Sequence, residues 1–429
     1  MEDSVSIDID LIRKKLSQSS NPSFGPTTSI FRVDKRIRKM NEEAYTPDTI
    51  SIGPYHSDKQ NLQMQAMEDL KLRYAQALLI RTSERTSLEN YMEALKKVET
   101  EARRCYSEPI NHKENFIEML LFDGFFIIEL FRKSAEVVKP DDDDPIFYSN
   151  LRRARVVRDL LLPENQIPIS VLQTLFDLSK DPNSDTKSFI ELALKFFEGF
   201  IAEAIQKYPQ NNKTIRHKHL LDLLSYTLES SLPHGFMKKP PTSAAVLESL
   251  SCVTELRNSG VKFRKRADCN FIDIKFSEGV FEIPELWVDD YTDTFFRNII
   301  AYEQHCYGGR HYITSYALLM DFLINTADDV AILRGCGIIK NHLGDDNKVS
   351  SLINNLCNEV STKHFCYGDL CYKVREYYNS PYNKWIETLR RDYCNSPWTI
   401  ISVIAAILLL LLTIWLAVFA AFPVFNVHV

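Results

Sequence analysis

The sequence predicts a mainly α-helical α+β protein with one small antiparallel β hairpin or sheet and one carboxyl-terminal transmembrane helix. Apolar residues recur at helical spacing through most of the 429-residue chain. The period changes to two only near residues 261–288, and an uncharged apolar run closes the chain. We therefore expect a mobile arm at 1–29, a mostly helical globular body at 30–395, a membrane anchor at 396–422 and a short tail at 423–429.

Helical periodicity begins at Leu62, where apolar residues fall near one face. The segment Phe116–Phe131 is apolar on nearly all sides and too short to span a bilayer, so it is the predicted core helix. Further helices are predicted downstream. They cover Phe189–Tyr208, His217–Leu232, Ala244–Arg257, Phe295–His305, Tyr312–Thr326, Asp328–Arg334, Ser350–Val360, Cys366–Tyr378 and Tyr382–Tyr393.

Predicted strands are confined to one region. Apolar and polar residues alternate in Phe271–Phe276, Ser277–Gly279 offers turn residues, and Val280–Ile283 returns. This pattern predicts a small antiparallel hairpin or three-stranded sheet within 261–288. Prolines and a glycine at 233–243 predict a linker inside the body.

The segment Thr399–Phe422 carries no charged side chain. At about 1.5 Å per residue it forms a helix of ~36 Å, which crosses a ~30 Å hydrocarbon layer with some tilt. Lys and Arg precede this segment and none follows it, so the body is predicted to stay cytosolic. The length favours the plasma membrane over the endoplasmic reticulum. The predicted anchoring residues are Trp398, Thr399, Ile400, Leu410, Trp415 and Phe422.

Composition excludes several classes of protein. A net charge of −6 speaks against a nucleic-acid binder. Nine cysteines form no CxxC pair and no disulfide framework, which fits a reducing compartment. Two basic runs, Arg32–Lys39 and Lys262–Arg266, are interpreted as a solvated face or a charged edge strand rather than as lipid-binding or import signals.

Metal and cofactor sites are not predicted. His364, Cys366 and Cys371 have the only zinc-like spacing, but zinc ligands usually occur in tighter pairs. The acidic run Asp141–Asp144 lacks the spaced oxygen ligands and the glycine of an EF-hand loop.

One polar cluster surrounds a glycine bend and comprises Glu303, His305, Arg310 and His311. A cysteine, a histidine and a carboxylate can support nucleophilic catalysis. However, His305 and Cys306 are neighbours on a predicted helix, where their side chains diverge by ~100°. We expect a helix end at which Glu303 and Arg310 satisfy backbone groups, and no catalytic residue is assigned. No GxSxG, P-loop, GxGxxG or HExxH motif occurs in the chain.

A second polar motif, LPENQIP at Leu162–Pro168, sets three polar residues between two prolines. Glu164, Asn165 and Gln166 are expected to hydrogen-bond to nearby backbone and to fix a sharp turn between two helices. A ligand contact is the less favoured interpretation.

An ordered set of motifs runs through nearly the whole chain. It comprises IFRVDKRIRKMNEEAYTPDTISIGPYH, FIEMLLFDGFFIIELF, DLLLPENQIPISVL, HKHLLDLL, RNIIAYEQHC, LINTADDVAILRGCGII and SPWTIISVIAAILLLLLT. In this order the motifs resemble the plant family named domain of unknown function 247. Where that family often has a cysteine beside DGFF and a polar glutamine late in the tail, this chain has Phe125 and Trp415. The predicted anchor is accordingly more apolar.

The resemblance implies a mostly helical plant protein with a carboxyl-terminal membrane segment and no established enzymatic activity. It also implies relatives that act in pollen recognition during self-incompatibility or in stress and defence responses. We therefore expect a non-catalytic, membrane-anchored recognition or signalling protein that contacts the lipid bilayer and an unidentified protein partner. The alternatives are a membrane-bound enzyme centred on Glu303, His305 and His311, and an extracellular determinant that would carry a glycan on Asn212.

Overall fold

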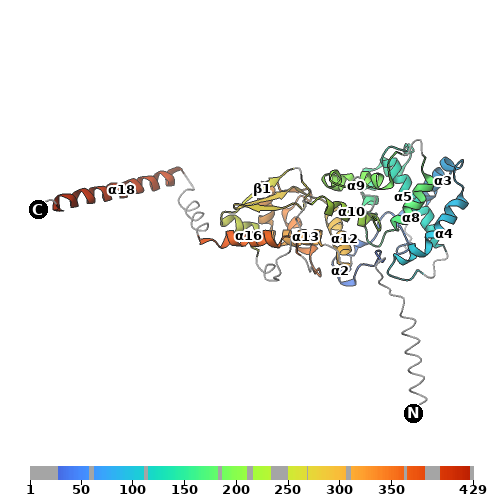
Figure 1. Ribbon diagram of the computed structural model, residues 1–429, viewed down its shortest axis with the longest axis horizontal. Coiled ribbons are helices and arrows are strands. Elements are labelled where there is room, and N and C mark those ends of the chain that lie inside the picture. The colour runs from blue at the N-terminus through green and yellow to red at the C-terminus, as the bar shows by residue number, and fades with distance from the viewer. Residues whose placement is uncertain are drawn as a thin grey trace, which may run out of the picture.

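The chain, as a computed structural model, is mainly helical with two small sheets, which confirms the predicted fold class (Figure 1). The structure describes residues 28–57, 62–110, 115–181, 186–209, 216–232, 250–267, 269–305, 311–361, 365–381 and 397–425. The helices are α2 (Lys35–Met40), η1 (Glu43–Tyr45), α3 (Leu62–Thr82), α4 (Leu88–Arg104), α5 (Phe116–Ser134), α6 (Pro145–Tyr148), α7 (Asn150–Asp159), α8 (Ile169–Ser179), α9 (Phe189–Gln206), α10 (Leu220–Ser230), α11 (Val253–Asn258), α12 (Thr292–His305), α13 (Tyr312–Leu323), α14 (Ala327–Gly335), α15 (Asp346–Leu356), α16 (Gly368–Asn379) and α18 (Pro397–Phe425).

Helix α5 is the central helix of the amino-terminal half, as its all-round apolar sequence predicted. It packs against α3, α4, α8 and α9. Its residues Phe125 and Phe131 are fully buried, and the Phe131 ring centroid lies 5.0 Å from that of Phe196 on α9. Burying one such side chain contributes roughly 1.5–3 kcal/mol, so this helix supplies much of the core.

The predicted hairpin is confirmed. Strand β2 (Lys275–Ser277) pairs antiparallel with β3 (Val280–Pro284). The two turn residues, Glu278 and Gly279, have φ of 50° and 76°, the left-handed values that a two-residue hairpin turn needs. A side chain at position 279 would also collide with Tyr377 of α16. The hairpin and α16 are therefore packed closely together.

Three further strands are present. Lys262–Arg266 forms the charged edge strand that was one of the two interpretations of this basic run, and 286–288 lies inside the predicted β region, whereas the strand at 339–341 and the parallel pairings were not predicted. Strand β1 (Lys262–Arg266) pairs parallel with β3, and β4 (Leu286–Val288) pairs parallel with β5 (Ile339–Asn341). Strand β1 lacks an apolar alternation because four of its five residues are cationic. Strands of three residues are too short to show a period, and the segment that contains β5 resembled a turn-rich connection.

The segment 28–57, which we call the strap, joins the two halves of the body. At one end Ile30 forms a bridge with Tyr106. Further along, the Asn298 side chain of α12 donates to the Ala44 carbonyl at 2.9 Å. The strap therefore contacts elements that are far apart in the sequence, and one buried core extends from Ile30 to Val374.

The predicted arm at 1–29 falls largely outside the described residues. Of the predicted arm, Thr28 and Ser29 are described, and Ser29 is buried with its N–H donating to the Cys105 carbonyl at 2.9 Å. The body thus begins before Ile30. The predicted linker at 233–243 and the predicted helix at 382–393 lie outside the described residues. The same core includes residues on both sides of that linker.

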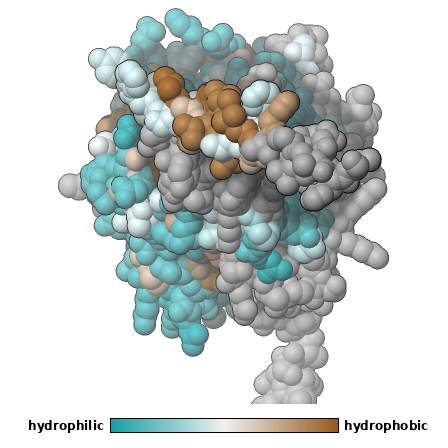
Figure 2. Space-filling model, turned by 90° about the vertical axis from the view of Figure 1, so that its left-hand side faces the viewer, coloured by the Kyte–Doolittle hydropathy of each residue, from teal (hydrophilic) through white to brown (hydrophobic). Residues whose placement is uncertain are grey.

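Helix α18 confirms the predicted long apolar helix. Its segment Ile401–Phe419 has a mean hydropathy of 2.9 and no buried residue. Figure 2 views the molecule from the end where α18 lies, with the apolar side chains of this helix as a brown group in front of the body. The helix extends to Phe425, so the first residues of the predicted tail are helical.

Candidate functional site

Glu303 closes the bend between α12 and α13. Its two carboxylate oxygens accept hydrogen bonds from the backbone N–H groups of Ile313 and Thr314, at 2.9 and 2.8 Å, and from the Thr314 hydroxyl at 2.7 Å. Burial raises the pKa of this carboxyl to about 7, because the donors that oppose burial are neutral. Glu303 thus accepts hydrogen bonds from backbone N–H groups in the first turn of α13, as the sequence predicted for a helix end.

The histidines of the predicted cluster point elsewhere. His305 Nδ1 lies 2.9 Å from the Ala301 carbonyl, and its ring stacks on Phe31 at 4.0 Å between centroids. His311 Nδ1 lies 3.3 Å from the Gln304 amide nitrogen. Arg310 and Cys306 fall outside the described residues. The contacts described for Glu303, His305 and His311 are therefore with other residues and not with one another.

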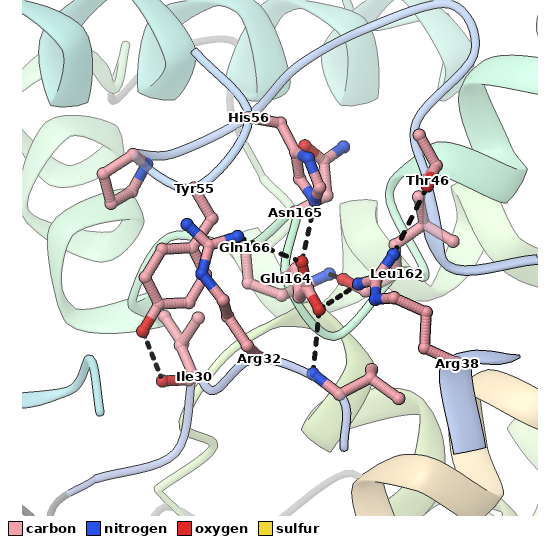
Figure 3. A network of polar contacts seen from close by, with 12 residues as sticks. Ile30, Arg32, Arg38, Thr46, Tyr55, His56, Leu162, Glu164, Asn165 and Gln166 are labelled. Atoms are coloured by element: carbon pink, nitrogen blue, oxygen red, sulfur yellow. Dashed lines mark hydrogen bonds and ion pairs between the residues drawn. The ribbon is translucent and has the colours of Figure 1, made fainter. Parts of the chain in front are cut away.

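Glu164 is the centre of a larger buried network, drawn in Figure 3. Its Oε1 accepts the Val33 backbone N–H at 2.8 Å and an Arg38 guanidinium N–H. Its Oε2 lies 3.1 Å from His56 Nε2 and 3.5 Å from Arg32 Nη1. All four partners belong to the strap. One carboxylate on a turn therefore fixes both ends of a segment more than a hundred residues away.

Burial alone would raise the pKa of Glu164, but His56 and Arg38, together with the Val33 N–H, hold it below its ordinary value. The carboxylate is thus charged at neutral pH. Removing one partner of such a buried pair typically costs 3–5 kcal/mol, because the other charge stays buried.

The predicted hydrogen bonds from LPENQIP to nearby backbone are confirmed for Asn165 and Gln166 but wrong for Glu164, whose partners lie on the distant strap. The Asn165 side chain accepts the Ile52 N–H at 2.7 Å and donates to the Ile50 and Asp159 carbonyls at 3.0 and 2.9 Å. The Gln166 amide donates to the Leu160 carbonyl at 2.7 Å. Hydrogen bonds to local backbone therefore fix the turn, and the Asn165 side chain also binds the backbone of the strap.

Three charged residues missed by the sequence analysis hold the same part of the strap. Asp159 accepts the N–H groups of Thr49 and Ile50 at 2.7 and 2.9 Å. Asp123 accepts the Gly53 N–H at 2.7 Å and a hydrogen bond from Lys71 at 2.6 Å. A signal was present, because an apolar segment with a glycine–proline turn and no periodicity must satisfy its buried backbone with side chains.

The arrangement most similar to a catalytic relay lies beside α10. The Tyr208 hydroxyl is 2.8 Å from His217 Nε2, and His217 Nδ1 is 3.8 Å from Asp222 Oδ2. Asp222 also accepts the Tyr302 hydroxyl at 2.5 Å and the Lys218 N–H at 2.8 Å. His217 is buried, and neither hollow described for this molecule is lined by these residues. The group therefore holds the chain after α9 and the start of α10 against α12.

An open hollow of about 620 Å³ lies between α9, α12 and the strands. Its lining combines aromatic rings, among them Phe271 and Tyr291, with the ionic side chains Lys265 and Glu285. Trp287 stands at its edge with 58% of its surface exposed. The sequence analysis missed this hollow, because its walls come from segments that are distant in sequence.

The predicted anchoring residues lie on α18. Trp398, Leu410 and Trp415 are 78%, 60% and 57% exposed. The side chains of Thr399, Ile400 and Phe422 fall outside the described residues. The segment Ile401–Phe419 is strongly apolar, and none of its residues is buried.

Metal ligands do not converge within the described part of the chain, where no three His, Cys, Asp or Glu residues could hold an ion. Cys371 is buried, which raises the pKa of its thiol to about 12, and His364 lies outside the described residues.

Comparison with known proteins places these features in a family. A family model described as a plant protein of unknown function, DUF247, matches residues 30–412. The UPF0481 protein At3g47200 of Arabidopsis thaliana is 30% identical over 408 residues, covering 90% of this chain and 84% of its own. A second Arabidopsis UPF0481 protein, At3g02645, is 25% identical over 485 residues, covering 90% and 89%. No solved structure matches the chain significantly.

Proposed function

The chain belongs to the DUF247 family of plant proteins, and from this premise we propose that it is a non-catalytic recognition or signalling protein held at a membrane by α18. The observation that carries the proposal is the helix itself. A segment with mean hydropathy 2.9 and no buried residue exposes a large apolar surface, which soluble proteins rarely do. Lipid is the natural environment for such a surface.

The chemistry of the body supports a non-catalytic role. Glu164 is occupied by the strap, Glu303 by the start of α13, and Asp222 by the Lys218 N–H before α10 and by Tyr302 of α12. An enzyme keeps a nucleophile, an acid or a base open to its substrate. In the described residues these buried titratable groups instead close contacts between helices.

Orientation and address form a finer part of the proposal. Lys384, Arg390 and Arg391 precede α18, and basic residues on this side of the helix favour a cytosolic body. The length of α18 favours the plasma membrane. By resemblance to the family, we propose that the partner is a protein of pollen recognition or of a stress or defence pathway.

Proximity labelling in plant tissue tests this proposal. The full chain and a fusion carrying only residues 397–425 are each joined to a labelling enzyme, so that labelling due to membrane address alone is subtracted. We expect a set of cytosolic-side proteins labelled by the full chain and not by the control. Identical labelling by both would contradict a recognition role for the body, and protease protection of the body in intact vesicles would contradict the orientation.

A further inference from the structure

The open hollow between α9, α12 and the strands is separate from the buried polar networks. Its aromatic lining consists of Phe271, Tyr291, Phe295 and Phe296, and Trp287 stands at its edge. Its volume of about 620 Å³ falls in the range of roughly 300–1,000 Å³ that is usual for binding sites. A hollow of aromatic rings beside an exposed tryptophan is typical of the centre of a protein–protein interface.

The wall that α9 contributes is low, because Gly199 and Ala202 have little or no side chain. A Cβ added at Gly199 would meet no described atom within 4 Å beyond its own helix, so packing does not require a glycine there. The φ of Gly199 is not positive, so the backbone conformation does not require one either. Glycine inside a helix is destabilising relative to alanine. What this glycine provides is open space in the hollow.

The cations of the hollow already have carboxylate partners. Lys265 Nζ lies 2.8 Å from Glu285 Oε1, and Arg266 Nη1 lies 2.9 Å from Asp273 Oδ1. Lys340, which is next to the hollow, also pairs with Glu285, at 3.1 Å. An incoming anion would have to compete with these carboxylates, so an anionic ligand is disfavoured.

Two carboxylates of the lining have no cationic partner in the part of the chain that the structure describes. Glu203 lies on α9, and Lys207, one turn further along, donates instead to a backbone carbonyl at the end of α10, at 3.5 Å. The hydrogen bonds described for Asp289 come from neutral donors, the Tyr291 N–H at 3.0 Å and the Thr292 hydroxyl at 2.9 Å. The hollow therefore combines aromatic rings with carboxylates that can accept a cation.

We propose that the hollow binds an arginine side chain of a partner protein, with Glu203 and Asp289 as the acidic acceptors. This inference rests on the proposed recognition role of the body. A guanidinium presents a planar set of donors to a carboxylate and also stacks on aromatic rings, so it matches both components of the hollow. Arginine is also enriched among the residues that dominate the binding free energy of interfaces.

Trp287 and the open shape of the hollow favour a protein as the source of this cation. The indole N–H of Trp287 donates to Glu285 Oε2 at 3.1 Å, so this exposed ring loses little conformational freedom when a partner covers it. A small ligand is normally enclosed over most of its surface, whereas a side chain carried by a larger surface can enter an open hollow.

Selection of displayed random peptides on the full chain, held in phosphatidylcholine nanodiscs, tests the proposal. The affinity of each enriched peptide is then measured for the wild type and for two test variants. Gly199→Leu places a side chain in the hollow, and its control, Gly199→Ala, also favours the helix but leaves most of the space open. Glu203→Gln removes a carboxylate from the lining, and its control, Glu198→Gln, removes one from α9 outside the lining.

We expect the enriched peptides to share an arginine beside an apolar residue. Gly199→Leu should weaken their binding at least about thirtyfold, the loss typical of a residue at the centre of an interface. Glu203→Gln should weaken it about tenfold, because a charged hydrogen-bond acceptor is lost. The two control variants should bind as the wild type does. Replacing the arginine of the peptide by lysine should also weaken binding, because an ammonium group cannot form the planar contact.

Enriched peptides that need no cation, or that bind Gly199→Leu as tightly as the wild type, would overturn the inference and leave recognition elsewhere on the body intact. A selection that enriches no peptide would also overturn it. If in that case spermidine binds the wild type but not Gly199→Leu, the occupant is a small organic cation. Identical proximity labelling by the full chain and the membrane control would instead contradict the recognition role on which the inference rests.

Discussion

Two buried glutamates, in the turn after α7 and at the end of α12, meet opposite electrostatic environments. Glu164 faces Arg38, Arg32 and His56 of the strap, and its pKa is lowered. Glu303 receives hydrogen bonds from neutral donors of α13, and burial raises its pKa to about 7. Burial acts in the same direction on both groups, so the presence of cations decides the sign of the shift.

The largest expected effect is the loss of stability when the carboxylate of Glu164 is removed. Glu164→Ala removes the acceptor of Val33, Arg38 and His56, and we expect the free energy of unfolding to fall by about 3–5 kcal/mol. Denaturant unfolding of the full chain in detergent measures it. The matched control is Glu108→Ala, which removes an exposed partner of Arg32 and should cost no more than about 1 kcal/mol. Equal costs for the two variants would contradict the central place of Glu164.

The pH dependence of stability should have opposite signs in the two regions. For Glu303 the folded pKa of about 7 exceeds the ordinary 4.5, so the folded state binds more protons between these values. Stability should therefore fall as pH rises from 4.5 to 7, by roughly 3 kcal/mol. For Glu164 the folded pKa lies below 4.5, so its contribution is present above pH 4.5 and is lost as pH falls through the lowered pKa.

Unfolding at a series of pH values, with Glu303→Gln as the comparison, isolates the first of these contributions. The difference between wild type and variant should change across pH 4.5–7 and stay constant above it. A difference that does not vary with pH would show that Glu303 is ionised in the folded protein throughout this range.

A smaller effect is expected from the donors of Glu303. Thr314→Val keeps the shape of the side chain but removes the hydroxyl that donates to the carboxylate at 2.7 Å. Because hydrogen bonds to charged groups contribute about 1.5–3 kcal/mol, stability at pH 8 should fall by that amount. The pKa of Glu303 should also rise, and carboxyl chemical shifts in NMR titration measure it. An unchanged pKa would mean that this donor does not favour the charged form.

The smallest effect is expected at the edge of the Glu164 network. Arg32 is 46% exposed and lies 3.5 Å from Glu164, so solvent screens its attraction. Arg32→Gln should cost no more than about 1 kcal/mol, whereas Arg38→Gln, at a more buried guanidinium, should cost more. If both variants cost the same, burial would not govern the contribution of these cations.

Local chemistry made some of these features predictable from the sequence. The apolar composition of α5 and the turn residues Glu278 and Gly279 act locally, and so does Gln166, whose amide donates to the Leu160 carbonyl. For the same reason the structural role of Glu303 followed from its place at a helix end. These predictions needed no knowledge of the tertiary fold.

Long-range pairing explains what the sequence did not reveal. The partners of Glu164 lie more than a hundred residues away, and β5 pairs with β4 across α12 to α14. Runs of adjacent carboxylates such as Asp141–Asp144 are usually solvated, yet Asp144 is buried and accepts hydrogen bonds from the Tyr74 hydroxyl and Lys133 Nζ at 2.6 and 2.8 Å. Whether a charge faces water or a partner depends on the fold, so neighbouring residues do not determine it.

Glu164 and Glu303 both stabilise contacts inside the body. The proposed link to the membrane is α18. Alkaline carbonate washing of plant membranes that contain the full chain tests this link most directly, with a chain lacking residues 397–425 as the control. We predict that the full chain stays in the pellet and that the control is released. Release of the intact full chain into the supernatant would contradict the account.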